Sequence, residues 1–354
     1  MTPILKKSLK YVIIAVLIVG SIWGVVHNLD IDQFIEIFSN IRWEYALLSV
    51  PIAILSNVVR AVRWKIYLKP IKEAKSFLNL FSAVMVGYAI NNITPRGGEI
   101  VRPFVYARRE NISKSAVLAT IIVERVIDVI FLLILFFIAF LASKESIMAA
   151  FPWLTTDSLT YMSILVLAVV VMLFLVISTN IVERIIKLVA KPLLPKYYDK
   201  IAATWDNFKV GFASLKNGKS YIKNILYSAL MWFLYAIPSY MMFFCFDFQD
   251  TLHLGIFDAG LLLVVSGIGM SIAPTPGGIG VYHWLITTAL MSLHPSISNE
   301  EALAFATVAH GVNLLQQVLV GMIFIVRENV RGIPKDDVAT EEVAIETNDE
   351  LSNI

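Results

Sequence analysis

The chain has 354 residues, of which 58% are hydrophobic and 16% charged, and its formal net charge is +2. This composition is far more apolar than one soluble core requires, so most of the chain must face lipid or other buried helices. It excludes a separate soluble enzyme domain, because no hydrophilic stretch is long enough for one, and the single cysteine excludes a disulfide framework and a thiolate metal site. We therefore expect an all-α polytopic membrane protein.

Two apolar segments, residues 11–28 and 43–64, open the chain, and each is close to the roughly 20 residues that cross a hydrocarbon layer as a helix. Lysines precede the first segment and follow the second, whereas the connector between them is mainly acidic. The positive-inside rule then places the N-terminus and the connector after residue 64 in the cytoplasm. No Ala-x-Ala-like cleavage site follows the first segment, so we expect an anchored helix and not a removed signal peptide.

Residues 77–107 form an interrupted apolar segment with a break at 91–98 that contains proline and glycine. The part after the break bears Glu99 and Arg102 and cannot span alone, and Arg108 and Arg109 follow it as another cytoplasmic signature. The segment therefore enters and leaves from the inside, as a re-entrant hairpin. Proline and glycine free backbone groups that lipid cannot satisfy, so the break must be covered by protein or by a water-filled cavity.

Four more spans and a second interrupted segment follow in alternating direction. The spans are predicted at residues 115–142, 159–179, 221–246 and 302–326, and the interrupted segment, with its break at 273–280, at residues 254–293. Nine basic and three acidic residues between 180 and 223 predict a basic cytoplasmic connector. Basic residues after 326 place the C-terminus in the cytoplasm too, and the acidic tail 336–354 is expected to be disordered.

The two breaks align with each other, Gly97-Gly98 with Gly277-Gly278 and Val101 with Val281. Residues 1–335 then read as one membrane domain with two halves, about 1–142 and about 159–335. Each half holds three spanning helices and one broken re-entrant helical hairpin, in inverted orientation. Inverted repeats with broken helices are typical of secondary transporters. The alternative is that the breaks belong to two ordinary kinked helices.

Three motifs carry a resemblance. They are Asn92-x-x-Pro95-x-Gly97-Gly98-Glu99-x-x-Arg102, Glu124-Arg125-x-x-Asp128 and Pro274-x-Pro276-Gly277-Gly278-x-Gly280-Val281. With them the chain resembles, from about residue 6 to 331, the lysylphosphatidylglycerol synthase transmembrane family, also called flippase-like domain proteins. In fused members a synthase domain adds lysine to phosphatidylglycerol, and the membrane part is thought to move the product across the bilayer.

The sequence contains no segment like that synthase domain, so the resemblance implies translocation of a lipid and not its synthesis. It departs from the family at His283, where a glutamate commonly follows the second glycine motif. This departure puts in doubt any mechanism that requires a carboxylate at that position.

Glu124, Arg125 and Asp128 lie about ten residues into a predicted span, which is roughly 15 Å deep and close to the midplane. A lone charge there costs on the order of 3 kcal/mol, so these groups should face the interior and pair. Glu124 and Asp128 share one helix face at i,i+4. Two interpretations stay open: a structural ion-pair cluster that holds the hairpin, and a headgroup site or proton relay.

Arg96 and Arg102 flank the first break, where a half-helix beginning near Gly98 would also favour an anion. Together they predict a phosphate site, since guanidinium binds phosphate in a bidentate way. Alternatively Arg102 neutralises Glu99 or Glu124, and both interpretations can hold in different states. We expect Arg60 and Arg63 to reach lipid headgroups at the end of their span and not to bind substrate.

The last span carries a polar stripe at i, i+3, i+6 and i+7, formed by His310, Asn313, Gln316 and Gln317. Interhelical hydrogen bonding explains this stripe, and a substrate path is the alternative. The histidines are too isolated in sequence to predict a metal, and no cofactor motif is present. The candidate substrate-binding residues are Asn92, Arg96, Gly97, Gly98, Glu99, Arg102, Glu124, Arg125, Asp128, Pro276, Gly277, Gly278, Gly280, His283, Asn313 and Gln317.

From these observations we expect a lipid translocase of the plasma (inner) membrane and not an enzyme. Its partners would be membrane lipids, either an anionic phospholipid or a polyprenyl-phosphate-linked lipid, and no nucleic acid. The alternative is a membrane-embedded lipid-phosphate enzyme or an accessory lipid-binding protein, with Glu124 or Asp128 as general base. An enzyme would normally need a metal-binding acid set or a nucleophile beside a base, and the sequence predicts neither.

Overall fold

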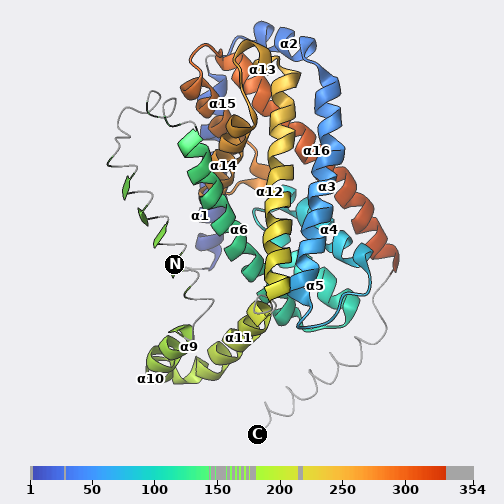
Figure 1. The fold of residues 1–354 in the computed structure, drawn as a ribbon, viewed down its shortest axis with the longest axis vertical. Helices are drawn as coiled ribbons and strands as arrows, with labels where there is room; N and C mark the ends of the chain where they lie inside the picture. Colours follow the sequence, from blue (N-terminus) through green and yellow to red (C-terminus); the bar gives the residue numbers. More distant parts are fainter. Residues whose placement is uncertain are drawn as a thin grey trace.

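The computed structural model describes residues 3–27, 29–142, 181–213 and 218–331, together with scattered positions from 144 to 175. All regular elements of this described part are helices, arranged as a long bundle (Figure 1). The predicted span at 159–179, apart from isolated positions, and the acidic tail at 336–354 lie outside the described residues. The expectation of an all-α protein is therefore confirmed for the part of the chain that the structure describes.

Three helices are long and apolar enough to cross a membrane: α3 (Trp43–Leu68), α12 (Gly218–Cys245) and α16 (Asn299–Arg331). Helix α1 (Pro3–Val26) and helix α2 (Ile31–Asn40) meet at an angle of 87° and count as a fourth span if they are taken together. Helix α2 lies in the predicted acidic connector, where the Asp30 side chain caps its start by accepting from the Gln33 N–H. The predicted span at 115–142 coincides with α6 (Lys114–Ala142).

The first interrupted segment folds as α4 (Phe77–Ile93) and α5 (Gly98–Glu110), so the predicted break is confirmed. Asn91 Oδ1 accepts from the Gly98 N–H at 2.8 Å and thereby satisfies one of the backbone groups freed at the start of α5. Residue 98 must be glycine here, because a Cβ atom would lie 1.9 Å from the carbonyl oxygen of Gly87 on α4. The two arms of the hairpin can approach closely only for this reason.

The second interrupted segment folds as α14 (Ile256–Ile272) and α15 (Val281–Leu293), joined through the short turn η2 (Pro276–Gly278). This break is also confirmed. Gly277, Gly278 and Gly280 have φ angles of 60°, 77° and 81°. These values lie in the left-handed region that only glycine adopts readily, so the glycines allow the chain to turn between the two half-helices.

The predicted basic connector folds as α9 (Ile181–Ile185), a π-helical stretch (Ile186–Ala190), α10 (Lys191–Leu193) and α11 (Pro195–Ala213). Proline interrupts the helix between α10 and α11, as expected for a residue that cannot donate a backbone hydrogen bond. Helix α11 packs against α6. These helices lie at the lower end of the bundle in Figure 1.

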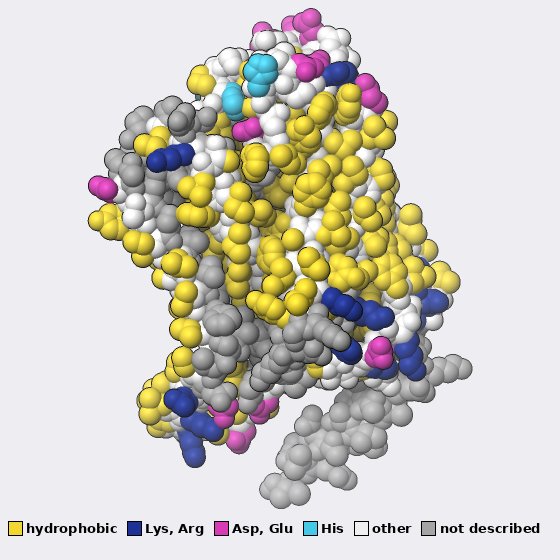
Figure 2. Space-filling view, in the orientation of Figure 1, with side chains coloured by type: hydrophobic (Ala, Val, Ile, Leu, Met, Phe, Trp, Pro, Cys, Tyr) yellow, Lys and Arg dark blue, Asp and Glu magenta, His cyan; other side chains and the backbone are white. Residues whose placement is uncertain are grey.

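Helices α3 and α12 run antiparallel along the bundle, and the two hairpins lie toward its opposite ends (Figure 1). One core joins the end of α3 to the start of α4, the end of α5 and the start of α6. A second core joins the start of α3 and the end of α12 to the second hairpin and the start of α16. Figure 2 shows a broad hydrophobic side between these ends, with mostly basic side chains below it and mostly acidic ones above.

The tips of the two hairpins meet in the middle of the bundle. A Cβ atom on Gly277 would lie 3.1 Å from Asn92 Oδ1, so the second turn packs directly on the end of α4. Arg96 Nη2 donates to the carbonyl oxygen of Ser271 near the end of α14, at 2.7 Å. The two breaks, far apart in sequence, therefore form one contact region.

Candidate functional site

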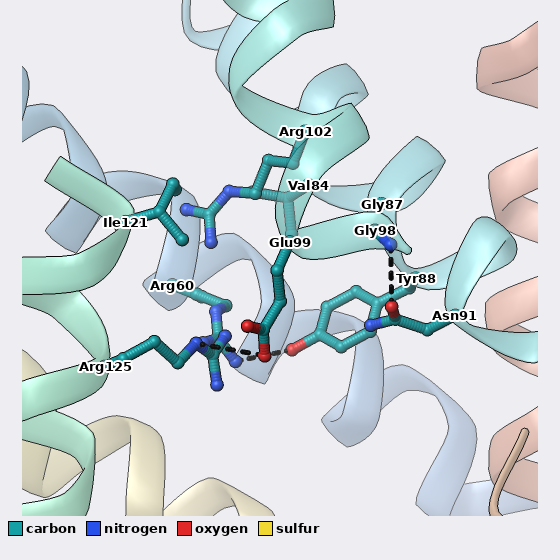
Figure 3. Close-up of a pocket in the computed structure, with 10 residues that line it drawn as sticks. All are labelled: Arg60, Val84, Gly87, Tyr88, Asn91, Gly98, Glu99, Arg102, Ile121 and Arg125. Carbon is teal, nitrogen blue, oxygen red and sulfur yellow. Dashed lines mark hydrogen bonds and ion pairs between the residues drawn. The ribbon is translucent and has the colours of Figure 1, made fainter. Parts of the chain in front are cut away.

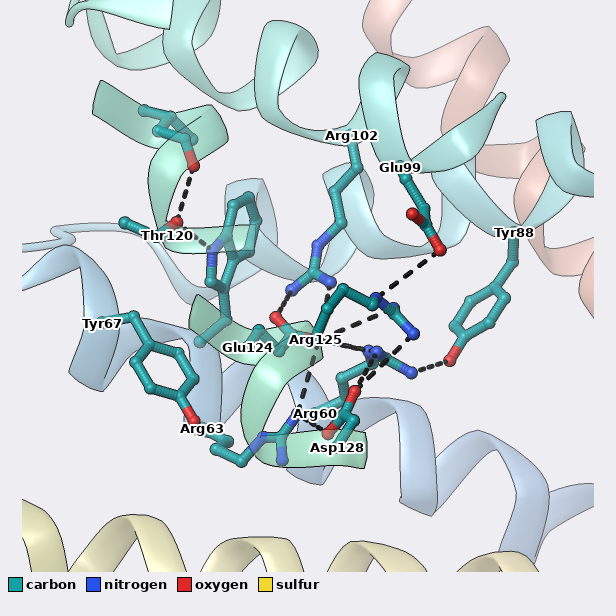
Figure 4. A network of polar contacts seen from close by, with 12 residues as sticks. Arg60, Arg63, Tyr67, Tyr88, Glu99, Arg102, Thr120, Glu124, Arg125 and Asp128 are labelled. Atoms are coloured by element: carbon teal, nitrogen blue, oxygen red, sulfur yellow. Dashed lines mark hydrogen bonds and ion pairs between the residues drawn. The ribbon is translucent and has the colours of Figure 1, made fainter. Parts of the chain in front are cut away.

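A cluster of buried charges lies beside the first break, between α3, α5 and α6 (Figure 4). At its centre the Glu124 carboxylate, which is fully buried, contacts Arg60 at 2.7 Å and Arg102 at 3.0 Å. Asp128 accepts from Arg63 at 2.6 Å and from Arg60 at 3.0 Å. The cluster is thus one connected ion-pair network of five buried side chains.

Helical spacing brings these side chains to one place. Arg60 and Arg63 are three residues apart on α3, and Glu124 and Asp128 are four residues apart on α6, so each pair lies on one face of its helix. Arg102 lies one turn into α5, which begins immediately after the break. The break therefore positions Arg102 against the carboxylates of α6.

Neutral groups complete the environment of the arginines. Arg60 Nη1 donates to the hydroxyls of Tyr88 at 2.7 Å and Tyr235 at 3.0 Å. The guanidinium carbon of Arg102 lies 4.0 Å from the ring centroid of Trp64, whose indole N–H donates to Thr120 at 2.9 Å. This stacking holds the guanidinium plane while its edge faces Glu124.

The buried part of the cluster has one positive charge in excess. Three guanidinium groups (Arg60, Arg63 and Arg102) face two carboxylates (Glu124 and Asp128), and each of these five residues is at most 7% exposed. A second pair lies closer to the surface, where Arg125 Nε is 3.6 Å from Glu99 Oε1 and the two side chains are 40% and 33% exposed. This outer pair is neutral as a whole, so the excess charge remains uncompensated by the protein.

A small recess opens at the cluster (Figure 3). Its volume is about 20 Å³, which is room for about one water molecule. A phosphate group would enter only if the side chains moved apart. The residues that line the recess are Arg60, Val84, Gly87, Tyr88, Asn91, Gly98, Glu99, Arg102, Ile121 and Arg125.

The structure brings together six of the residues singled out in the sequence: Gly98, Glu99, Arg102, Glu124, Arg125 and Asp128. Gly97 lies in the break immediately before α5. Arg96 does not converge with Arg102, because its side chain is directed to the end of α14. In this structure the two arginines that flank the break therefore do not form one joint anion site.

Arg60 and Arg63 correct the sequence interpretation. They were expected to reach lipid headgroups, but they are 5% and 0% exposed and pair with Glu124 and Asp128. Helix α3 continues for eight residues beyond Arg60 and five beyond Arg63 to Leu68, so neither arginine lies at its end. The sequence did contain a signal, since Ser56, Arg60, Arg63 and Tyr67 recur at helical spacing on one face of α3.

A second polar group lies at the other break. Asn92 Nδ2 is 3.4 Å from Gln317 Oε1, and Gln317 Nε2 is 3.3 Å from Asn313 Oδ1, so these amides form a chain along α16. His310 Nε2 lies 2.7 Å from the carbonyl oxygen of Gly277, between Pro276 and Gly278 of the turn η2. Gly280 and His283 lie at the start of α15. Among the described residues, no three histidine, cysteine, aspartate or glutamate side chains gather as metal ligands would.

Curated UPF0104 membrane proteins are similar to the chain. One from Methanocaldococcus jannaschii is 24% identical over 303 residues, which cover 82% of this chain and 88% of the relative. Those from Pyrococcus horikoshii and Methanothermobacter thermautotrophicus are 25% and 26% identical, covering 78% and 72% of this chain and 84% and 78% of the relatives.

The family model for the lysylphosphatidylglycerol synthase TM region matches residues 9–321. The matched part contains both hairpins, the amide chain on α16 and every member of the ion-pair network. With most of its length covered in this way, the chain belongs to the family of the lysylphosphatidylglycerol synthase TM region.

Proposed function

We propose that this protein is a lipid translocase that moves an anionic, phosphate-bearing lipid headgroup across the membrane while the acyl chains stay in lipid. The observation that carries the proposal is the excess positive charge in the buried cluster, at a recess lined by the first break. A phosphodiester bears one negative charge, so its binding would neutralise that excess. Arginine suits this task because its planar fork binds phosphate oxygens in pairs.

The recess is small, so the headgroup would have to replace an internal contact. Arg102 is the candidate: its Nε and Nη2 atoms make no hydrogen bond, although Nη2 lies 3.0 Å from Glu124 Oε2. A phosphate that displaced Glu124 from Arg102 would keep the guanidinium paired. Without bound lipid, the Glu124 carboxylate would pair with Arg102. The cluster would then be a structural ion-pair network in the lipid-free protein and a headgroup site in the lipid-bound protein.

We also propose that the two halves form an inverted repeat with both termini in the cytoplasm. The packing supports this, because the helix pairs around one hairpin have counterparts around the other. Helix α4 packs on α16 as α14 packs on α6, α5 packs on α6 as α15 packs on α16, and α3 packs on α4 as α12 packs on α14. Helices α3 and α12, which would correspond to each other, pack together. Such repeats let a transporter open alternately to its two sides.

The test is lipid translocation in proteoliposomes that contain a trace of fluorescent phosphatidylglycerol. Dithionite quenches only the outer leaflet, so a translocase makes the inner pool accessible as well. Arg102→Ala should slow this step by about tenfold to a hundredfold, since a hydrogen bond to a charged group contributes about 1.5–3 kcal/mol. Arg102→Lys should also slow translocation, because lysine keeps the positive charge but cannot bind a phosphate through two parallel hydrogen bonds as arginine does.

Arg108→Ala is the matched control, because Arg108 is an exposed arginine on the same helix. It should translocate lipid at the wild-type rate. Equal rates for the Arg102 variants and wild type would refute the assignment of the site, and no transfer by the wild-type protein would refute the function. Mass spectrometry of the lipid after the assay should show intact lipid, whereas a hydrolysed product would favour the enzyme alternative.

A further inference from the structure

The second hairpin holds two histidines in contact beside its break. The ring centroids of His283 on α15 and His310 on α16 are 4.9 Å apart, with the ring planes nearly perpendicular. Tyr282 stacks on His310, with 4.9 Å between the ring centroids. His310 is only 7% exposed and His283 is half-buried, so the contact between the two imidazoles is largely shielded by the bundle.

Under the inverted repeat proposed above, this histidine pair corresponds approximately in the second half to the ion cluster in the first. The alignment of Val101 with Val281 matches Arg102 to Tyr282. Glu124 lies ten residues after the first residue of α6, and His310 lies eleven residues after the first residue of α16. The contact between Arg102 and Glu124 thus has its counterpart in the contact between Tyr282 and His310. Fixed charges in one half correspond to titratable, neutral groups in the other.

The surroundings of the pair carry no charge. Among the described residues, no carboxylate, lysine or arginine interacts electrostatically with either imidazole. A carbonyl oxygen only accepts, so His310 Nε2 carries the hydrogen in its contact with Gly277, and Nδ1 is left as the nitrogen that can take up a proton. Tyr282 from α15 and the Gly277 carbonyl contact His310, and Met270 from α14 lies with His310 beside Gly278. Asn92 from α4 lies beside Gly277, and Ser21 from α1 lies beside Gly280.

We infer that His283 and His310 together take up one proton from water when the anionic headgroup enters the second half of the protein and release it to water when the headgroup leaves. The inference rests on the proposed lipid translocation. A headgroup that left the arginines of the cluster would pass the neutral amides of Asn92, Gln317 and Asn313 and the exposed Arg96, whose side chain is held at the end of α14. The second break itself, residues 273–280, contains no charged residue. An anion without a countercharge is costly in such surroundings, and a protonated imidazole would supply the countercharge. Two imidazoles in contact take one proton more readily than two, because like charges repel.

The first test is the pH dependence of translocation in the proteoliposome assay. If only the protonated pair passes the headgroup, the wild-type rate should fall by about tenfold per pH unit above the titration range of the pair. His310→Gln, whose amide can still donate to Gly277, and His283→Asn should lose this dependence. His253→Gln is the matched control, because His253 is exposed, and it should keep the wild-type profile.

The second test does not require transport. The chain has five histidines, so ¹⁵N-histidine NMR in nanodiscs can resolve the pair, with each signal assigned by its loss in the two variants. Short-chain phosphatidylglycerol is the probe, and its addition should raise the pH at which the pair becomes protonated. An unchanged titration would overturn the inference.

The two tests separate the inference from the function on which it rests. Translocation at a rate that does not depend on pH would overturn the inference and leave the proposed function standing. Absence of translocation at every pH would refute the proposed function. If short-chain phosphatidylglycerol still raised the pH at which the histidine pair becomes protonated, proton uptake by the pair would remain linked to binding of the anion.

Discussion

Glutamine in place of Glu124 would test whether the ion-pair network of the cluster is shielded from bulk water. The substitution keeps the size of the side chain but removes the carboxylate that contacts Arg60 and Arg102. Three buried guanidinium groups would then face Asp128 alone, so the excess charge would rise from one to two. Removal of one partner from a buried ion pair costs about 3–5 kcal/mol, and we expect Glu124→Gln to lower the free energy of unfolding by that amount.

The measurement is unfolding in mixed micelles of dodecyl maltoside and sodium dodecyl sulfate, followed by the fluorescence of the seven tryptophans. Glu99→Gln is the matched control, since Glu99 is 33% exposed and lies 3.6 Å from Arg125. A partly exposed pair contributes at most about 1 kcal/mol, so this control should stay close to wild type. Adding Arg102→Met to Glu124→Gln should recover part of the loss, because it restores the charge balance. If Glu124→Gln costs no more than Glu99→Gln, water reaches the cluster and the excess-charge argument fails.

Two further predictions concern the hairpins. Gly98→Ala should lower the free energy of unfolding by at least about 3 kcal/mol, because the new methyl group would lie 1.9 Å from the Gly87 carbonyl oxygen, whereas Gly260→Ala, with nothing within 4 Å, should change it by no more than about 1 kcal/mol. A similar loss in both variants would contradict the close packing of the first hairpin. Cysteines at the exposed positions Arg108 and Asp250 should react with a membrane-impermeant maleimide from the cytoplasmic and the outer side, respectively. Reaction of both from one side would refute the inverted arrangement.

The sequence predicted the helices and their breaks well, because those depend on local chemistry. Proline and glycine interrupt two apolar segments, and the structure begins new helices at Gly98 and Val281. How the hairpins pack could not be predicted in the same way. The contact of Arg96 with the end of α14 joins residues 175 positions apart, and no local pattern specifies such a partner.

The ion pairs of the cluster could be predicted only in part, because their partners also lie far apart in the sequence. Glu124 and Asp128 had to pair because they lie deep in an apolar span, but their partners could not be identified from spacing alone. Arg60 and Arg63 were assigned to the surface because an arginine near the end of a span can extend to the headgroups or turn inward. The packing of α3 on α6 and α12 decides this question, and that packing is a property of the whole fold.

Helices α3 and α12 are joined at both ends. At one end the Arg42 N–H donates to the Cys245 carbonyl oxygen at 3.0 Å, and at the other the Tyr67 hydroxyl donates to Asn224 at 2.5 Å. The two helices should therefore move as one rigid body, with Arg60 and Arg63 carried on it. Arg102 belongs instead to a half-helix only 13 residues long. A ligand bound between the arginines of α3 and Arg102 would contact one stationary helix and one movable helix. A small tilt of α5 could then release the ligand while α3 and α12 stay in place.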